Sequence, residues 1–144
     1  MSIPDPQIGL VLSYSYLWHH EHRAGRQEGA KNRPCVVVFS VLRPDGGNAI
    51  VRVVPVTHSP PEKPAAAFEL PAAVKRYLGL DAERSWVILD EVNEFGWPGF
   101  DLRPVPGAPG SFTYGFLPPR LFNQLMAKLV EVWKQGHGKA TPRD

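Results

Sequence analysis

Prolines and glycines interrupt this chain at short intervals, and they limit the length of any regular element that it can form. The sequence holds 16 prolines and 13 glycines in 144 residues, and they are scattered along the chain. Proline lacks a backbone N–H and glycine is favoured in turns, so both residues end strands and helices. The pattern therefore favours a β-rich fold with short elements and tight connections.

The composition is typical of one globular domain. Hydrophobic residues make up 43% of the chain and charged residues 21%, and the chain is long enough to bury a core. We assign residues 1–135 to a single domain and residues 136–144 to a flexible tail. The net charge of +2 permits an anionic partner but is far below that of a dedicated nucleic-acid coat protein.

Two features of the sequence bear on where the protein works. Cys35 is the single cysteine, which excludes an internal disulfide, and its place in a run of valines indicates a buried, inert thiol. The N-terminal segment MSIPDPQIG lacks the basic region of an export signal, and no apolar run approaches the ~20 residues of a membrane span. We therefore expect a cytoplasmic protein that is neither exported nor membrane-bound.

Hydrophobic periodicity and turn signals predict the regular elements. Alternating or β-branched runs predict strands at 8–16 (half-buried), 35–42, 49–57, 85–92 and 111–117. Helices are expected at 70–80 and, as an amphipathic C-terminal helix, at 118–133.

The remaining long segments are expected to be irregular. The polar segment 17–32 is typical of a mobile loop, and the segment after 92 is rich in turn residues. The sequence thus predicts a mainly β (β-rich α+β) protein, a small, strongly curved antiparallel sheet or barrel with a short helix and a C-terminal α-helix.

The stretch EGAKNRPCVVV places charged residues directly before a predicted core strand. Pro34 fixes its own φ and restricts Arg33 to an extended conformation at the entrance of that strand, where a guanidinium suits phosphate. A solvated polar loop is the alternative interpretation of Glu28 and Arg33.

The stretch VVPVTHSPP ends the following strand with Thr57, His58 and Ser59 between prolines. A strand-terminating turn explains these residues equally well. Their position adds information, because the Asp-Gly-Gly hairpin joins this strand to the one that begins near Arg33. In an antiparallel pair the start of one strand lies beside the end of the next. Arg33 and Thr57 should therefore be neighbours at one end of the sheet.

The histidine-rich stretch HHEH, residues 19–22, could bind a metal ion. The sequence offers no matching Cys/His pair downstream, so a polar loop is the favoured interpretation and we predict no metal site. A histidine here, such as His22, could instead contact RNA, because imidazole titrates near neutrality. The chain also lacks a glycine-rich phosphate loop and a G-x-S-x-G motif, which disfavours nucleotide hydrolases and serine acyl enzymes.

Several ordered motifs resemble a known family. The order G-x-V-L, Y-L-W, K-x-R-P-C-V-V-V, V-V-P-V-T-H-S and L-G-L-x-x-x-R-S-W-V-I-L-D-E-V is similar to that of the MazF/PemK toxin endoribonucleases. The resemblance spans residues 9–92, and the C-terminal helix falls where the family has one. It implies an SH3-like barrel that acts as a homodimer, cuts single-stranded RNA without a metal or cofactor, and is neutralised by a cognate antitoxin.

The resemblance also implies roles for individual residues. Arg33 corresponds to the arginine that stabilises charge on the phosphorane or acts as general acid, and Thr57 to an active-site threonine that contacts phosphate. Glu28 is a candidate general base, and Asp90 matches an aspartate that some members use in catalysis. The expected RNA-binding residues are Lys31, His58, Ser59 and His22.

The sequence departs from the family pattern at two places. Ile88 stands where some members have an arginine two residues before the aspartate, and Arg103 comes much later than the arginine of the usual D-Q-[IV]-R segment. The departures favour a non-cutting member as an alternative, and the competing hypotheses to a nuclease toxin are a barrel that binds without cutting, a CcdB-like gyrase poison, and a metal hydrolase that uses HHEH.

Overall fold

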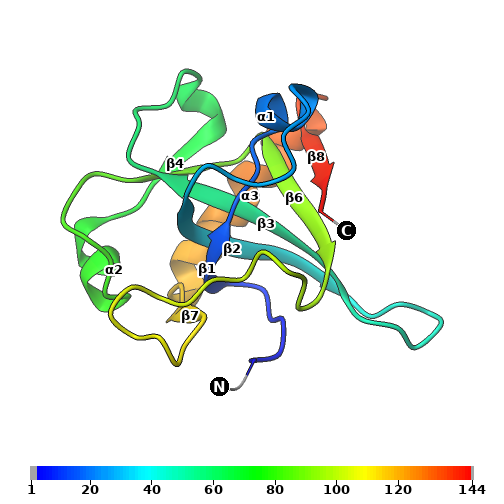
Figure 1. Cartoon of the computed structure of the whole chain (residues 1–144). Helices are drawn as coiled ribbons and strands as arrows, with labels where there is room; N and C mark the ends of the chain where they lie inside the picture. The colour runs from blue at the N-terminus through cyan, green and yellow to red at the C-terminus, as the bar shows by residue number, and fades with distance from the viewer. Residues whose placement is uncertain (1–2, 144) are drawn as a thin grey trace.

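A computed structural model of the chain describes residues 3–143 and shows a β-rich protein with a C-terminal helix (Figure 1). The elements in chain order are β1 (Leu10–Ser15), α1 (His19–Arg23), β2 (Asn32–Val41), β3 (Ile50–Thr57), the 3-10 turn η1 (Pro64–Ala66), β4 (Ala67–Glu69), α2 (Ala72–Tyr77), β5 (Trp86–Ile88), β6 (Glu91–Gly96), β7 (Thr113–Phe116), α3 (Pro119–Lys134) and β8 (Lys139–Pro142). The predicted fold class, β-rich α+β with a short helix and a C-terminal helix, is confirmed.

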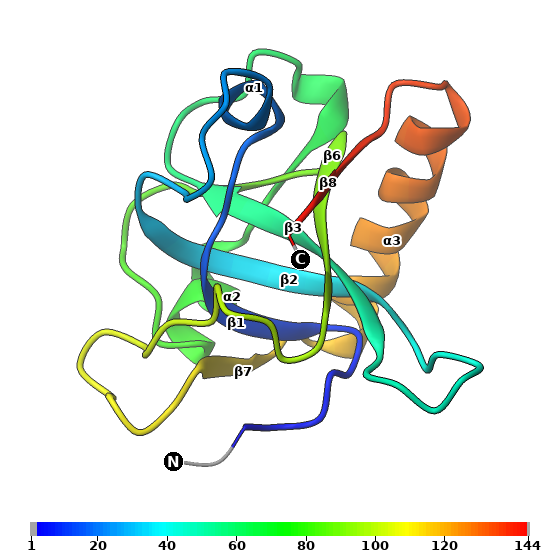
Figure 2. The same cartoon turned by 45° about the vertical axis from the view of Figure 1, so that its right-hand side comes forward.

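Strand β3 is the branch point of the sheet. The strands follow the order β4-β5-β3-β2-β1-β7, and β6 also pairs with β3. Strand β3 pairs with β2 along one edge, and two strands share its other edge. Of these, β6 pairs with residues 50–53, and β5 pairs with Val56 and Thr57. These pairs are antiparallel, whereas β8 lies parallel to β6. Figure 2 shows β2 and β3 crossing the middle of the molecule, with α3 along one side.

Two hydrophobic clusters lie on opposite faces of the central strands. Val36 and Val54 pack in the cluster that includes α3, whereas Val37 and Val53 pack with the aromatic residues of the other cluster. Successive residues of a strand point to opposite faces, so these valine runs supply both cores at once. The same arrangement buries β1 along its whole length, and the prediction of a half-buried first strand was wrong.

Helix α3 presents its apolar stripe to the first cluster, as predicted. Phe122, Leu125 and Val132 are buried, and Trp133 donates its indole N–H to the carbonyl oxygen of Leu89 at 2.8 Å. Val130, within the helix predicted at 118–133, is exposed. Within the described part of the chain, no helix is long and apolar enough to cross a membrane.

Two further predictions of local structure were wrong. The segment 85–92 forms two strands, β5 and β6, and β6 continues into residues expected to be turns. The segment 17–32 is not a featureless loop, because it contains α1. Local periodicity missed both features, because partners distant in sequence hold these segments.

The prediction of a flexible tail was also wrong for residues 139–143. These residues form β8 against β6, and the guanidinium of Arg143 is buried. Its Nε and Nη2 donate to the two carboxylate oxygens of Asp101 at 3.0 and 3.1 Å, and Nη2 also donates to the carbonyl oxygen of Gln27 at 2.6 Å. A bidentate buried pair of this kind fixes the C-terminal strand.

Replacing Arg143 by alanine should strongly destabilise the fold, because it leaves the Asp101 carboxylate buried without its partner. We expect Arg143→Ala to lower the free energy of unfolding by about 3–5 kcal/mol, measured by urea denaturation. Arg84→Ala is the control, because it breaks a pair with Glu69 on the surface and should have little effect. Equal losses in the two variants would contradict the structural role of Arg143.

Candidate functional site

Arg33 lies at the entrance of β2 with its side chain half-buried. Its Nη1 donates to the carbonyl oxygen of Val56 at 3.4 Å, and its guanidinium carbon lies 5.1 Å from the ring centroid of Trp18. Within residues 3–143 it forms no ion pair, and its buried Nε has no hydrogen-bond partner. Burial lowers the pKa of Arg33, but an arginine stays protonated in proteins. The site therefore holds a positive charge with unused donors.

Thr57 ends β3 beside Arg33. The β2–β3 register pairs Cys35 with Pro55, and continuing it by two residues places Arg33 opposite Thr57. The Thr57 hydroxyl accepts a hydrogen bond from the backbone N–H of Ser59 at 3.1 Å, which fixes the turn after the strand. The prediction that Arg33 and Thr57 lie together at one end of the sheet is confirmed.

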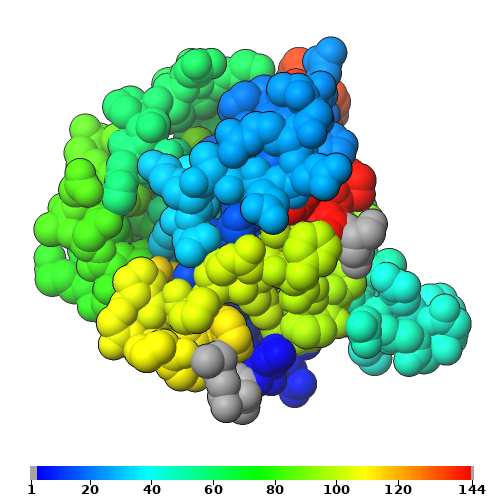
Figure 3. Space-filling view, viewed as in Figure 1, coloured from blue at the N-terminus to red at the C-terminus, as the bar shows by residue number. Residues whose placement is uncertain are grey.

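A pocket of about 430 Å³, here called the Arg33 pocket, opens at this end of the sheet. Five of the residues predicted from the sequence line it: Lys31, Arg33, Thr57, Ser59 and Asp90. Figure 3 shows this part of the surface hollowed between the blue-to-cyan segment that leads into β2 and the green segments that follow β3. The pocket combines cations, a hydroxyl and carboxylates in an open cleft.

Glu28 and His22 lie elsewhere. Both are exposed and line a different pocket, beside Phe100 and Arg143. The hydrogen bond from Arg143 to the carbonyl oxygen of Gln27 holds this part of the chain next to the C-terminal strand. The sequence-based assignment of Glu28 and His22 to the site of Arg33 is therefore not supported by their positions.

Glu91 is the acid that sequence reasoning missed. It lines the Arg33 pocket next to Asp90, and its Oε1 accepts hydrogen bonds from the Tyr16 hydroxyl and the His19 N–H, both at 3.0 Å. Burial raises the pKa of the Glu91 carboxyl, and the neighbouring Asp90 charge adds to the rise. In one continuous strand these two acids would point to opposite faces. The break between β5 and β6 lets both reach the pocket.

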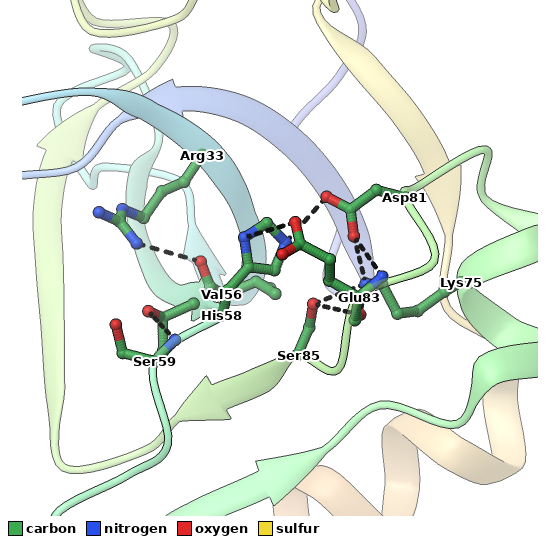
Figure 4. Close-up of polar contacts among 9 residues, drawn as sticks. Arg33, Val56, His58, Ser59, Lys75, Asp81, Glu83 and Ser85 are labelled. Carbon is green, nitrogen blue, oxygen red and sulfur yellow. Dashed lines mark hydrogen bonds and ion pairs between the residues drawn. The ribbon is translucent and has the colours of Figure 1, made fainter.

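His58, although next to Thr57 in sequence, lies on the other side of Arg33. Its Nε2 is 2.8 Å from a carboxylate oxygen of Asp81, and its Nδ1 is 3.6 Å from one of Glu83 (Figure 4). Hydrogen bonding from Lys75 and the charges of Lys75 and His58 lower the pKa of Asp81. Both imidazole nitrogens therefore face carboxylates of the loop that contains Asp81 and Glu83.

The HHEH stretch forms α1 and does not gather metal ligands. Glu21 is buried, and its carboxylate accepts hydrogen bonds from the Trp18 N–H at 3.1 Å and from Arg26 at 2.9 Å. Across residues 3–143, the group with ligand atoms within 4.8 Å of one another is instead His58, Asp81 and Glu83. The ammonium of Lys75 lies 2.7 Å from Asp81 and opposes a cation there. Within residues 3–143, HHEH contributes no ligand to a group of this kind.

Comparison with protein-family models and with curated proteins found no match to this chain.

Replacing Glu91 by glutamine should change how stability depends on pH. The raised pKa means that the folded state favours the protonated carboxyl, so the contribution of Glu91 to stability is present below its usual value of 4.5 and is lost as the pH rises through the folded-state pKa. Glutamine keeps an oxygen that can accept both hydrogen bonds but cannot ionise. We therefore expect the Glu91→Gln variant to gain stability relative to the wild type as the pH rises above 4.5.

Urea denaturation at a series of pH values measures this difference. Glu62→Gln, which changes an exposed carboxyl at the rim of the same pocket, supplies the reference curve. A difference between wild type and Glu91→Gln that stays constant with pH would contradict the prediction.

Proposed function

We propose that this protein is a metal-independent endoribonuclease toxin of a type II toxin–antitoxin system, which cuts single-stranded RNA by attack of the 2′-hydroxyl. The observation that supports the proposal best is that Arg33, Thr57 and the Asp90–Glu91 pair line one open pocket. The resemblance of the R-P-C-V-V-V and V-P-V-T motifs to the MazF/PemK toxins points to the same chemistry. The proposal includes a cytoplasmic homodimer and a cognate antitoxin.

The positive charge of the pocket suits a phosphate. The guanidinium of Arg33 lacks an ion pair within the described residues and is held by Trp18 on one side and Val56 on the other. Such a fixed, half-buried cation can stabilise the charge of a phosphorane without reorganising. Lys31 adds a second cation, and Thr57 supplies a hydroxyl at the strand end.

The Asp90–Glu91 pair supplies the base in place of Glu28. A carboxylate with a raised pKa is a stronger base, and the Tyr16 and His19 hydrogen bonds orient Glu91. Glu91 accepts the proton of the 2′-hydroxyl, the 2′-oxygen forms a bond to phosphorus, and the bond to the 5′-oxygen breaks. The departing 5′-oxygen takes a proton from water, and a 2′,3′-cyclic phosphate remains. No metal is required for these steps.

The departure at Ile88 has a chemical consequence. Ile88 lines the Arg33 pocket, so an arginine at this position would face the same phosphate. With an apolar side chain there, the arginine and lysine residues of the pocket lining are Arg33, Lys31 and Lys63, and of these only Arg33 is half-buried. We therefore expect the proposed activity to be sensitive to the loss of Arg33.

RNA cleavage in the presence of EDTA tests the proposal. We expect the wild-type protein to cut unstructured RNA in preference to structured RNA.

Arg33→Ala should lower the cleavage rate about 10²–10³-fold, as removal of a charge-stabilising donor does in other enzymes. Glu91→Gln should lower it about 10²–10⁴-fold through loss of the base. Thr57→Ala should weaken substrate binding. Arg76→Ala, on the exposed surface of α2, is the matched arginine control.

Two results would overturn the proposed site. One is equal cleavage by the wild type and Arg33→Ala, and the other is cleavage that disappears with EDTA. Growth arrest with intact RNA and broken DNA would instead favour the gyrase-poison alternative. Failure to cut or bind RNA under any of these conditions would leave a barrel that binds another partner.

A further inference from the structure

A second pocket lies on the opposite side of Arg33 from the proposed reaction site. This pocket, here called the Tyr114 pocket, has a volume of about 340 Å³ and shares Lys31 and Arg33 with the Arg33 pocket. Its volume is in the range of small-molecule sites. A phosphate on Arg33 would therefore have a separate recess on each side.

The walls of the Tyr114 pocket combine apolar surfaces with a few polar groups. Pro34, Leu80 and the half-buried ring of Tyr114 supply apolar contact area. Ser13 is 1% exposed, and its hydroxyl donates to the carbonyl oxygen of Pro104 at 3.2 Å and forms a side-chain hydrogen bond with Tyr114. Asn32 offers an amide at the rim. A flat ring with hydrogen-bonding edges fits such a recess.

The side of this pocket formed by residues 79–85 is held by a buried lysine. Lys75 is 4% exposed, and its ammonium donates to Asp81 and to the Ser85 hydroxyl, both at 2.7 Å, and to the carbonyl oxygen of Glu83 (Figure 4). His58 closes on Asp81 from the opposite side. All three donors of the ammonium are satisfied, so the loop is fixed before any ligand binds.

We propose that the Tyr114 pocket binds one unstacked nucleobase of the RNA strand whose phosphate lies on Arg33. Proteins that read single-stranded RNA commonly hold splayed-out bases against aromatic rings and bond to their edges. Here Tyr114, Ser13 and Asn32 would select the base next to the phosphate. The inference rests on the proposed function, because it takes the Arg33 phosphate as its fixed point.

Binding of single nucleotides tests this inference without any cleavage step. The full chain, labelled with ¹⁵N, is titrated separately with each of the four ribonucleoside 5′-monophosphates and with ribose 5-phosphate, which lacks a base. We expect at least one nucleotide to bind about tenfold or more tightly than ribose 5-phosphate, the gain that base stacking provides. The backbone amide signals of Asn32, Leu80 and Tyr114 should shift only when a base is present.

Two tyrosine variants make a matched pair. Tyr114→Leu should abolish the preference for nucleotide over ribose 5-phosphate, whereas Tyr77→Leu, on the exposed surface of α2, should keep it. Should Tyr114→Leu lose its dispersed spectrum, Asn32→Ala at the rim takes its place and should reduce discrimination among the four bases.

Each other result overturns the inference. Equal binding of nucleotides and ribose 5-phosphate would do so, as would base-dependent shifts confined to the Arg33 pocket or the absence of any shift at the Tyr114 pocket. RNA cleavage that requires Arg33, combined with one of these results, removes this inference and leaves the proposed function standing. Absence of both Arg33-dependent cleavage and nucleotide binding removes both.

Discussion

The pairing of β2 with β3 is the constraint on which the other features depend. Their valine runs supply residues to both hydrophobic clusters, so the register of this one hairpin positions the two cores. A shift by one residue would exchange the faces of every side chain, which makes the register energetically specific. The same register places Arg33 opposite Thr57. The register that packs the two hydrophobic clusters therefore also brings Arg33 and Thr57 together at one end of the sheet.

The charges at that end are distributed unequally. Arg33 lies between two pockets and forms no ion pair within the described residues, whereas Lys75 and His58 are engaged by Asp81 and Glu83. The first arrangement leaves a cation available to an anionic ligand, and the second fixes a loop. Arg33 is therefore suited to binding an anion, whereas Lys75 and His58 hold the loop beside it in place.

The acidic residues around Arg33 were only partly predicted from the sequence. Glu28 lies five residues before Arg33, yet the adjacent Gln27 is held by Arg143 from the other end of the chain, and Glu28 lines a different pocket. Glu91 is far from Arg33 in sequence, yet it lines the same pocket because the chain breaks between β5 and β6. Proximity along the chain therefore pointed to a carboxylate that lies outside the Arg33 pocket. Hydrogen bonds between distant residues brought the other one into place.

The sequence by itself determined the β-rich class, the amphipathic C-terminal helix and the neighbourhood of Arg33 and Thr57. These depend on local signals: β-branched runs, helical periodicity and a hairpin turn that joins adjacent strands. Only the tertiary structure decided that residues 139–142 form β8, that Glu91 lines the Arg33 pocket, and that a second pocket lies beside Arg33. Each of these arises from contacts between segments far apart in sequence, and local residue patterns do not encode which distant partner a segment will meet.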